Sequence, residues 1–233
     1  LDTAGMCLAV AIGYDWLYDD MDAASREEIR RGFVRNGLEP VEKGGFWVNT
    51  GMNWGQVCNA GSIAVALALL DDEEKRAVDV VTRSIRGLPR QMAAYAPRGA
   101  FPEGPNYWAY ATEHNAVAIE LLTSVLGFDE GLSALPGFAE TADFIELTTG
   151  PTGQPFNFSD NHPTRGASFA IWWFARRFGR PDLPERFERA ALEKALGTPG
   201  FKSTLLPLAL LWMREPGGCD GGDAVATQDR DCS

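Results

Sequence analysis

Hydrophobic residues recur at helical spacing along most of the chain. Leu8, Ile12 and Trp16 follow one another every four residues, and residues 54–70 form an apolar, alanine-rich stretch that is typical of a buried helix. Strand patterns are nearly absent, and only 46–48 and 156–158 have the composition of short loop strands. Further helices are expected over 24–38, 71–95, 107–126, 134–149, 166–178, 183–196 and 205–213, with Ser25 as the N-cap of the first. The pattern therefore predicts an all-α fold.

The expected helices follow a repeating order. Segments of buried character begin near Ala4, Asn53, Tyr107 and Gly166, at intervals of 49, 54 and 59 residues, and a more polar, amphipathic segment follows each of them. Buried inner helices that alternate with amphipathic outer ones are typical of an α/α barrel or solenoid. The long loops that enter the inner helices would lie on one rim, where functional residues usually gather.

Composition and charge narrow the possible partners. The 233 residues include 32 acidic and 21 basic side chains, and this net charge of −11 argues against nucleic acid as a partner. No apolar run approaches the roughly 20 residues that span a bilayer, so no membrane partner is expected. The chain has only two histidines and no C-x-x-C pair, which makes a zinc site improbable, and we expect no cofactor. Cys7 and Cys58 are expected to be buried, whereas Cys219 and Cys232 could close a loop in the tail.

Three predicted loop segments mix aromatic side chains with amides and acids. Sugar rings present apolar faces for stacking and hydroxyl edges for polar partners, so this mixture is typical of carbohydrate sites. The tryptophans could equally plug the mouth of a barrel. The candidate residues are Trp47, Asn53, Trp54 and Gln56 in the first segment, Arg98, Glu103, Tyr107, Trp108, Tyr110 and His114 in and after the second, and Asp160 and His162 in the third.

Some of these residues suit proton abstraction next to a carboxylate. Tyr107, Tyr110 and His114 would share one face of a helix, and Glu103 immediately precedes it. An amide or protonated acid can bind a substrate carboxylate and so disperse charge in the enolate-like transition state. A tyrosine or histidine can then remove the α-proton and protonate the leaving oxygen. Tyr107 could also be a core aromatic whose hydroxyl is satisfied within the fold.

Several segments resemble heparinase II/III-family and related alginate-lyase polysaccharide lyases. The resemblance is carried by residues 11–18, by Asn53-Trp54 with Gly61, by 99–108 and by 157–160, and it covers most of residues 1–215. It implies an incomplete (α/α) toroid over 1–215 that cleaves a uronate-containing, acidic polysaccharide or oligosaccharide by β-elimination. It also implies that Asn53 neutralises the uronate carboxylate, that Tyr107 acts as the acid and often the base, and that Tyr110 and His114 help to bind substrate.

The same resemblance implies a β-sandwich domain after the toroid and a periplasmic or secreted bacterial protein. The strands of that domain would begin shortly after residue 215, where residues 216–233 instead form a Gly/Asp-rich tail. We therefore expect a toroid-domain fragment with a linker toward a missing C-terminal domain. Trp54 stands where many of these lyases have histidine. Because the net charge opposes a polyanion, Arg98, Arg165, Lys43 or the missing domain would have to offset it.

Two other functions remain open from the sequence. An α/α-barrel glycoside hydrolase would use Glu103 and Asp160 as paired carboxylates. A non-catalytic carbohydrate-binding scaffold is conceivable because Trp54 replaces a histidine. Replacement of Tyr107 by phenylalanine separates the first of these from a lyase, because a hydrolase should keep much of its activity.

Overall fold

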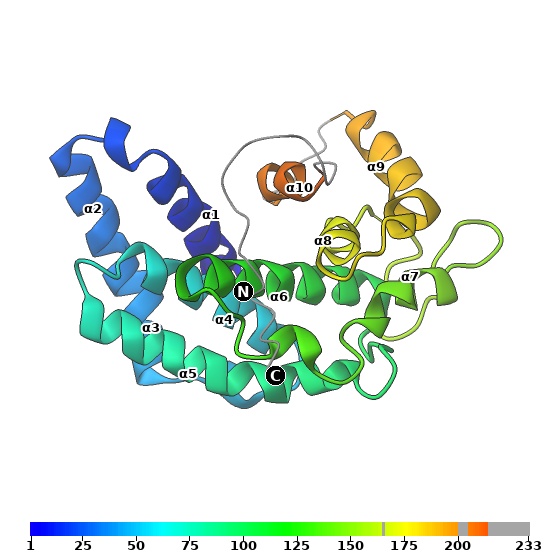
Figure 1. Ribbon diagram of the computed structural model, residues 1–233, viewed down its shortest axis with the longest axis horizontal. Coiled ribbons are helices and arrows are strands. Elements are labelled where there is room, and N and C mark those ends of the chain that lie inside the picture. Colours follow the sequence, from blue (N-terminus) through cyan, green and yellow to red (C-terminus); the bar gives the residue numbers. More distant parts are fainter. Residues whose placement is uncertain (165, 200–204, 214–233) are drawn as a thin grey trace, which may run out of the picture.

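The computed structural model describes residues 1–164, 166–199 and 205–213 of the chain. In this part the backbone forms helices and loops, with one isolated bridge between Thr149 and Pro155, so the prediction of an all-α fold is confirmed. The α-helices are α1 (Asp2–Trp16), α2 (Ala23–Phe33), α3 (Glu39–Lys43), α4 (Asn53–Ala68), α5 (Glu74–Met92), α6 (Gly104–Leu126), α7 (Phe144–Leu147), α8 (Ala170–Arg177), α9 (Arg189–Leu196) and α10 (Leu206–Trp212) (Figure 1).

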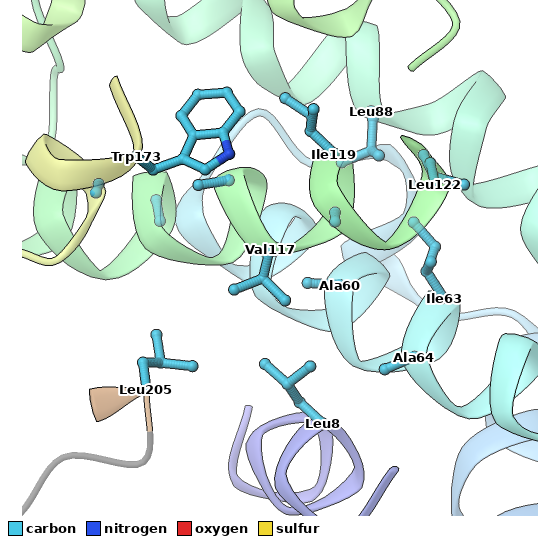
Figure 2. Packing of buried hydrophobic residues seen from close by; sticks show 14 of the residues in the cluster. Leu8, Ala60, Ile63, Ala64, Leu88, Val117, Ile119, Leu122, Trp173 and Leu205 are labelled. Atoms are coloured by element: carbon cyan, nitrogen blue, oxygen red, sulfur yellow. The ribbon is translucent and has the colours of Figure 1, made fainter. Parts of the chain in front are cut away.

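Helix α4 is the centre around which α1, α5 and α6 pack. All but three of its sixteen residues are buried, because small and apolar residues occupy every side of the helix. In Figure 2, Leu8 of α1, Ala60 of α4 and Val117 of α6 lie near one another in the shared core. The inner segments expected near Ala4, Asn53, Tyr107 and Gly166 correspond to α1, α4, α6 and α8.

Helix α5 covers α4 from outside. Its buried residues recur at three- and four-residue intervals, while charged residues occupy the opposite face, as expected for an amphipathic surface helix. Gln91 near its end donates from Nε2 to the carbonyl oxygens of Trp47 (3.3 Å) and Val48 (3.2 Å). This contact fixes the 3-10 turn Phe46–Asn49, which precedes α4, against the α4–α5 pair.

Gly61 allows α1 and α4 to approach closely. A Cβ atom at this position would lie 2.5 Å from the carbonyl oxygen of Ala4, a backbone atom that cannot move aside without shifting α1. We expect Gly61→Ala to lower the free energy of unfolding by about 1–3 kcal/mol. The matched control is Gly13→Ala on α1, which meets no atom within 4 Å and should stabilise the helix by about 0.5–1 kcal/mol. Urea unfolding followed by circular dichroism measures both, and equal effects would contradict this account.

Two local predictions are wrong. The N-cap of α2 is Asp22 instead of Ser25, because the Asp22 carboxylate accepts a hydrogen bond from the Ser25 N–H at 2.8 Å. The helix expected over 24–38 is confirmed, with α-helix to Phe33 and a π-helical turn over Val34–Leu38. The strand expected over 46–48 is the 3-10 turn already described.

The helix expected over 134–149 is also wrong. Only α7, four residues long, is α-helical there, and it follows the 3-10 turns Leu132–Ala134 and Glu140–Asp143. Gly137 provides the physical reason. Its φ of +82° is left-handed, and a Cβ there would lie 2.0 Å from the carbonyl oxygen of Tyr95. The segment is held close to the end of α5 in a shape that a regular helix cannot adopt.

The remaining expectations concern the cysteines, the tail and membrane-spanning helices. Cys7 and Cys58 are free and buried. Cys219, Cys232 and the tail over 216–233 lie outside the described residues. Among the helices that are described, none combines the length and apolar character needed to cross a membrane.

Candidate functional site

Two inner helices begin side by side, and a carboxylate joins them. The backbone N–H of Asn53, the first residue of α4, donates to Oε2 of Glu103 at 2.8 Å. The side-chain Nδ2 of Asn53 donates to Oε1 of the same carboxylate at 2.7 Å. Glu103 immediately precedes α6, whose first two residues are Gly104 and Pro105. The carboxylate therefore caps α4 and fixes the Asn53 side chain relative to the start of α6.

This contact also determines how the Asn53 amide is oriented. An ionised carboxylate only accepts hydrogen bonds, so the nitrogen and not the oxygen of the amide must face Glu103. The amide oxygen Oδ1 points elsewhere and is buried without a hydrogen-bond partner among the described residues. Nδ2 carries two hydrogens and one of them is bound by Glu103. Asn53 is only 2% exposed, so this amide is held in a desolvated position where a further hydrogen bond would be strong.

Tyr107 and Tyr110 occupy the first two turns of α6, next to this junction. Both are partly buried, and the Tyr107 ring packs against the core. Burial raises the pKa of Tyr110, and the charge of Asp2 raises it further. Tyr110 is therefore a half-buried side chain on the second turn of α6.

His114 lies one turn deeper on α6 than Tyr110. Its ring meets the Tyr110 ring edge-on, with centroids 4.8 Å apart. Nδ1 lies 2.7 Å from the Tyr110 carbonyl oxygen, which can only accept, so Nδ1 carries the proton and Nε2 is the free lone pair. Burial lowers the pKa of His114, which keeps the ring neutral at pH 7. The predicted catalytic histidine thus lies beneath Tyr110 and supports its ring.

The structure places Gln56 and Trp108 in the core instead of on a substrate-binding surface. Both side chains are fully buried, at 0% exposure. The Trp108 indole N–H donates to Oγ1 of Thr141 at 2.7 Å, and its ring packs near Phe144. Gln56 donates to the Gln91 carbonyl oxygen at 3.4 Å, between α4 and α5. Neither side chain has a face available for a sugar.

Arg98, Asp160 and His162 are exposed, on the two loops that flank the start of α6. The sequence analysis did not identify Asn161, which lies between Asp160 and His162. Asn161 is buried, and its Oδ1 accepts a hydrogen bond from the Asn106 N–H at 2.8 Å. This bond fixes the loop over 150–164 on the first turn of α6, and no pattern in the sequence distinguishes Asn161 from its polar neighbours.

The charges expected to offset the acidity of the chain are not gathered at this junction. Lys43 is exposed and pairs with Glu39 at 3.3 Å. Arg165 lies outside the described residues. Arg98 is the third cation named from the sequence, and it lies on the loop that precedes α6.

Trp47 and Trp54 line a cleft of about 270 Å³ between α1, α4 and the segment over 36–41. Both rings are partly buried, and Trp54 also contacts Phe46, with ring centroids 5.1 Å apart. No residue of α6 lines the cleft. Trp54 therefore faces the α1 side of α4.

Two other carboxylates, which the sequence did not indicate, accept backbone hydrogen bonds at the start of α8. Glu113 of α6 accepts a hydrogen bond from the Phe169 N–H at 2.9 Å, and Glu188 accepts one from the Ser168 N–H at 2.8 Å. Burial raises the pKa of Glu113 to about 8, and the charge of Glu188 also raises it. The two acids are 75 positions apart in the chain, so only the packed structure brings them together.

The raised pKa of Glu113 predicts a pH-dependent stability. The folded state binds more protons than the unfolded state between the ordinary value of 4.5 and about 8. The contribution of this group is therefore complete below pH 4.5 and is lost as the pH rises through 8. We expect Glu113→Gln, which still offers an oxygen to the Phe169 N–H, to be more stable than the wild type by about 1–3 kcal/mol at pH 8.5.

Urea unfolding of both proteins at pH 4 and pH 8.5 tests this expectation. The difference between them should be small at the lower pH and grow toward the higher one. A difference that is independent of pH would contradict the assignment of a protonated Glu113.

Comparisons with known proteins do not assign this chain to a family. Neither the protein-family models nor the curated protein sequences match this chain. The resemblance to polysaccharide lyases therefore rests on the sequence motifs alone. Within residues 1–164, 166–199 and 205–213, no three histidine, cysteine, aspartate or glutamate side chains are grouped so that they could hold a metal ion.

Proposed function

We propose that this chain is the helical domain of a polysaccharide lyase that cleaves uronate-containing polysaccharide by β-elimination. In this proposal α1, α4, α6 and α8 are the inner helices of an incomplete (α/α) toroid, and a β-sandwich domain completes the site. The observation that carries the proposal is the Asn53–Glu103 contact, which holds an oriented amide at the start of α6, the helix that carries Tyr107. The resemblance further leads us to propose a periplasmic or secreted protein.

The proposed reaction needs two tasks from these residues. Asn53 is only 2% exposed, so the start of α4 has to open for the uronate carboxylate to reach it; the second Nδ2 hydrogen is then donated to that carboxylate, which lowers the cost of the negative charge that develops next to it. The Tyr107 hydroxyl, in its ionised form, takes the proton from the carbon next to that carboxylate. The electron pair of that C–H bond forms a carbon–carbon double bond as the bond to the glycosidic oxygen breaks. Tyr107 then returns the proton to the leaving oxygen.

Glu103 serves as a positioning residue in this scheme. Both of its oxygens accept hydrogen bonds from Asn53, so the carboxylate is committed to holding the amide. This commitment weakens the hydrolase alternative, which needs Glu103 as one member of a carboxylate pair. Its proposed partner Asp160 is exposed on the loop over 150–164. A non-catalytic scaffold would keep the same contacts but would not turn over a substrate.

The ultraviolet absorbance of the unsaturated uronate product tests the proposal. The complete gene product is incubated with alginate, heparan sulfate, hyaluronan and chondroitin. We expect absorbance to rise with at least one polymer, because elimination leaves a conjugated double bond whereas hydrolysis does not. Shorter chains without a rise in absorbance would favour the hydrolase, and binding without cleavage would favour the scaffold.

A further inference from the structure

We propose that Asn161 is a positioning residue for the elimination reaction, because it fixes the start of α6 and with it the backbone that carries Tyr107. This inference rests on the proposed function, since it names a further residue on which the same reaction depends. Asn161 lies on the loop over 150–164 and is only 7% exposed. We assign it no contact with the substrate, so it would act only through the helix that it holds.

The start of α6 receives its cap from another part of the chain. Glu103 is the N-cap residue of α6, but both of its carboxylate oxygens accept hydrogen bonds from Asn53 of α4. Within the part of the chain that the structure describes, the Glu103 side chain makes no capping hydrogen bond to α6. The first backbone N–H groups of a helix have no acceptor inside the helix. Oδ1 of Asn161 accepts one of them, the N–H of Asn106, at 2.8 Å, as an N-cap side chain normally does.

The turn that carries Asn161 presents its amide in one direction. A backbone N–H only donates and a carbonyl oxygen only accepts, so Oδ1 must face Asn106 and Nδ2 must face the His162 carbonyl oxygen, at 2.8 Å. The Asn161 N–H also donates to the Phe158 carbonyl oxygen at 3.3 Å, which closes the turn. Ser159 within this turn has a left-handed φ of +55°, which non-glycine residues rarely adopt. The surrounding contacts therefore determine the conformation of the turn.

Gly104 allows this turn to lie directly against the start of α6. Its φ of +87° is left-handed, so glycine is favoured there. A Cβ atom at this position would lie 2.9 Å from the Phe158 carbonyl oxygen and 3.0 Å from Cβ of Asn161. The hydrogen bond from Asn106 thus belongs to a close contact between the turn and the helix.

The backbone just before Tyr107 has two anchors. Glu103 is bound to α4, and Asn106, three residues later, is bound to Asn161. Tyr107 directly follows Asn106, so Asn161 provides the anchor nearer to the proposed acid–base residue. Proton transfer depends on accurate placement, and a displacement of about 1 Å can lower a rate by about 100-fold. Loss of the Asn161 anchor should therefore slow the reaction even in a folded protein.

Two variants of Asn161 test this role. Asn161→Leu removes both polar atoms at nearly the same size and leaves the Asn106 N–H without its acceptor. We expect kcat for elimination to fall by about 10- to 100-fold, with a smaller change in KM. Asn161→Asp keeps an oxygen for the Asn106 N–H, at a helix N-terminus where negative charge is favourable, so it should recover most of the rate. Initial rates of absorbance increase, measured with the complete gene product on its preferred polymer, give both values.

The matched control is Asp22→Ala. Asp22 caps α2 with a bond of the same kind and length, since its carboxylate accepts the Ser25 N–H at 2.8 Å. Its loss should destabilise the protein and leave kcat unchanged. Circular dichroism establishes that each variant is folded.

Hydrogen exchange provides a readout that does not depend on activity. The backbone amides at the start of α6, that of Asn106 above all, should exchange about five- to tenfold faster in Asn161→Leu than in the wild type. In Asp22→Ala they should exchange at the wild-type rate.

Three results would overturn the inference. These are unchanged exchange at the start of α6 in Asn161→Leu, faster exchange there with an unchanged kcat, and a rate for Asn161→Asp as low as that of Asn161→Leu. Each of them leaves the proposed function intact, because the wild type still cleaves its polymer by elimination. No elimination by the wild type on any polymer would refute the proposed function, and the role of Asn161 with it. The wild type alone therefore tells the two failures apart.

Discussion

Tyr107→Phe is expected to lower the rate of β-elimination by about 10²- to 10⁴-fold, which is the usual contribution of a positioned acid–base group. The substitution removes only the hydroxyl oxygen, and the ring that packs against the core is kept. The fold and the affinity for substrate should therefore change little. Initial rates of absorbance increase on the preferred polymer measure the effect, and the loss should appear in kcat more than in KM.

The control for this variant is Tyr18→Phe. Tyr18 is exposed beyond the end of α1, where its ring lies under the guanidinium of Arg26, at 4.7 Å from the ring centroid. Its loss should leave the rate unchanged. If Tyr107→Phe retained most of the activity, Tyr107 would not be the proton-transfer residue, and the hydrolase alternative would gain support.

Asn53→Asp is expected to lower the free energy of unfolding at pH 7 by roughly 2–5 kcal/mol. The new carboxylate would face Glu103 at the distance of a hydrogen bond, in a position that is almost fully buried in the wild type. Like charges this close cannot both remain ionised at low cost, so the loss should shrink as the pH falls and one of the acids takes a proton. Urea unfolding at pH 7 and pH 4.5 measures this change.

A double variant separates the structural role of the Asn53–Glu103 contact from its role in catalysis. In Asn53→Asp combined with Glu103→Gln, the new amide at position 103 can donate to the carboxylate at position 53 and still accept from the backbone N–H. We expect most of the lost stability to return, with a coupling free energy of about 1–3 kcal/mol. Activity should stay low, because the donor for the substrate carboxylate is gone. A double variant as active as the wild type would contradict the role assigned to Asn53.

Strong periodic patterns made the helical core predictable. The apolar residues of α4 and the spaced hydrophobic residues of α5 encode their burial locally, and the structure confirms these helices within a few residues. Helix α1 also forms as expected, but only four of its fifteen residues are buried and Trp16 is exposed. The segment over 134–149 has a helical composition as well, but Gly137 and its contact with Tyr95 override it. That contact joins residues far apart in the chain and has no local signal.

The site was only partly predictable for the same reason. Asn53 and Glu103 were each singled out by residue type, but their contact spans 50 positions and occupies both Glu103 oxygens. Trp108 belongs to a motif rich in functional residue types, yet packing places it in the core. Glu113 and Glu188 lie in ordinary helical sequence, and only their convergence on the start of α8 shifts the pKa of Glu113.

The central claim is that the glycosidic bond is cleaved by β-elimination and not by hydrolysis. An isotope measurement tests this claim most directly. The complete gene product digests its preferred uronate polymer in water labelled with heavy oxygen, and mass spectrometry weighs the products. Elimination takes no oxygen from water, so we predict unlabelled products that carry a double bond and weigh one water less than the hydrolysis products. Products that carry the heavy oxygen and no double bond would contradict the account and assign the chain to the glycoside hydrolases.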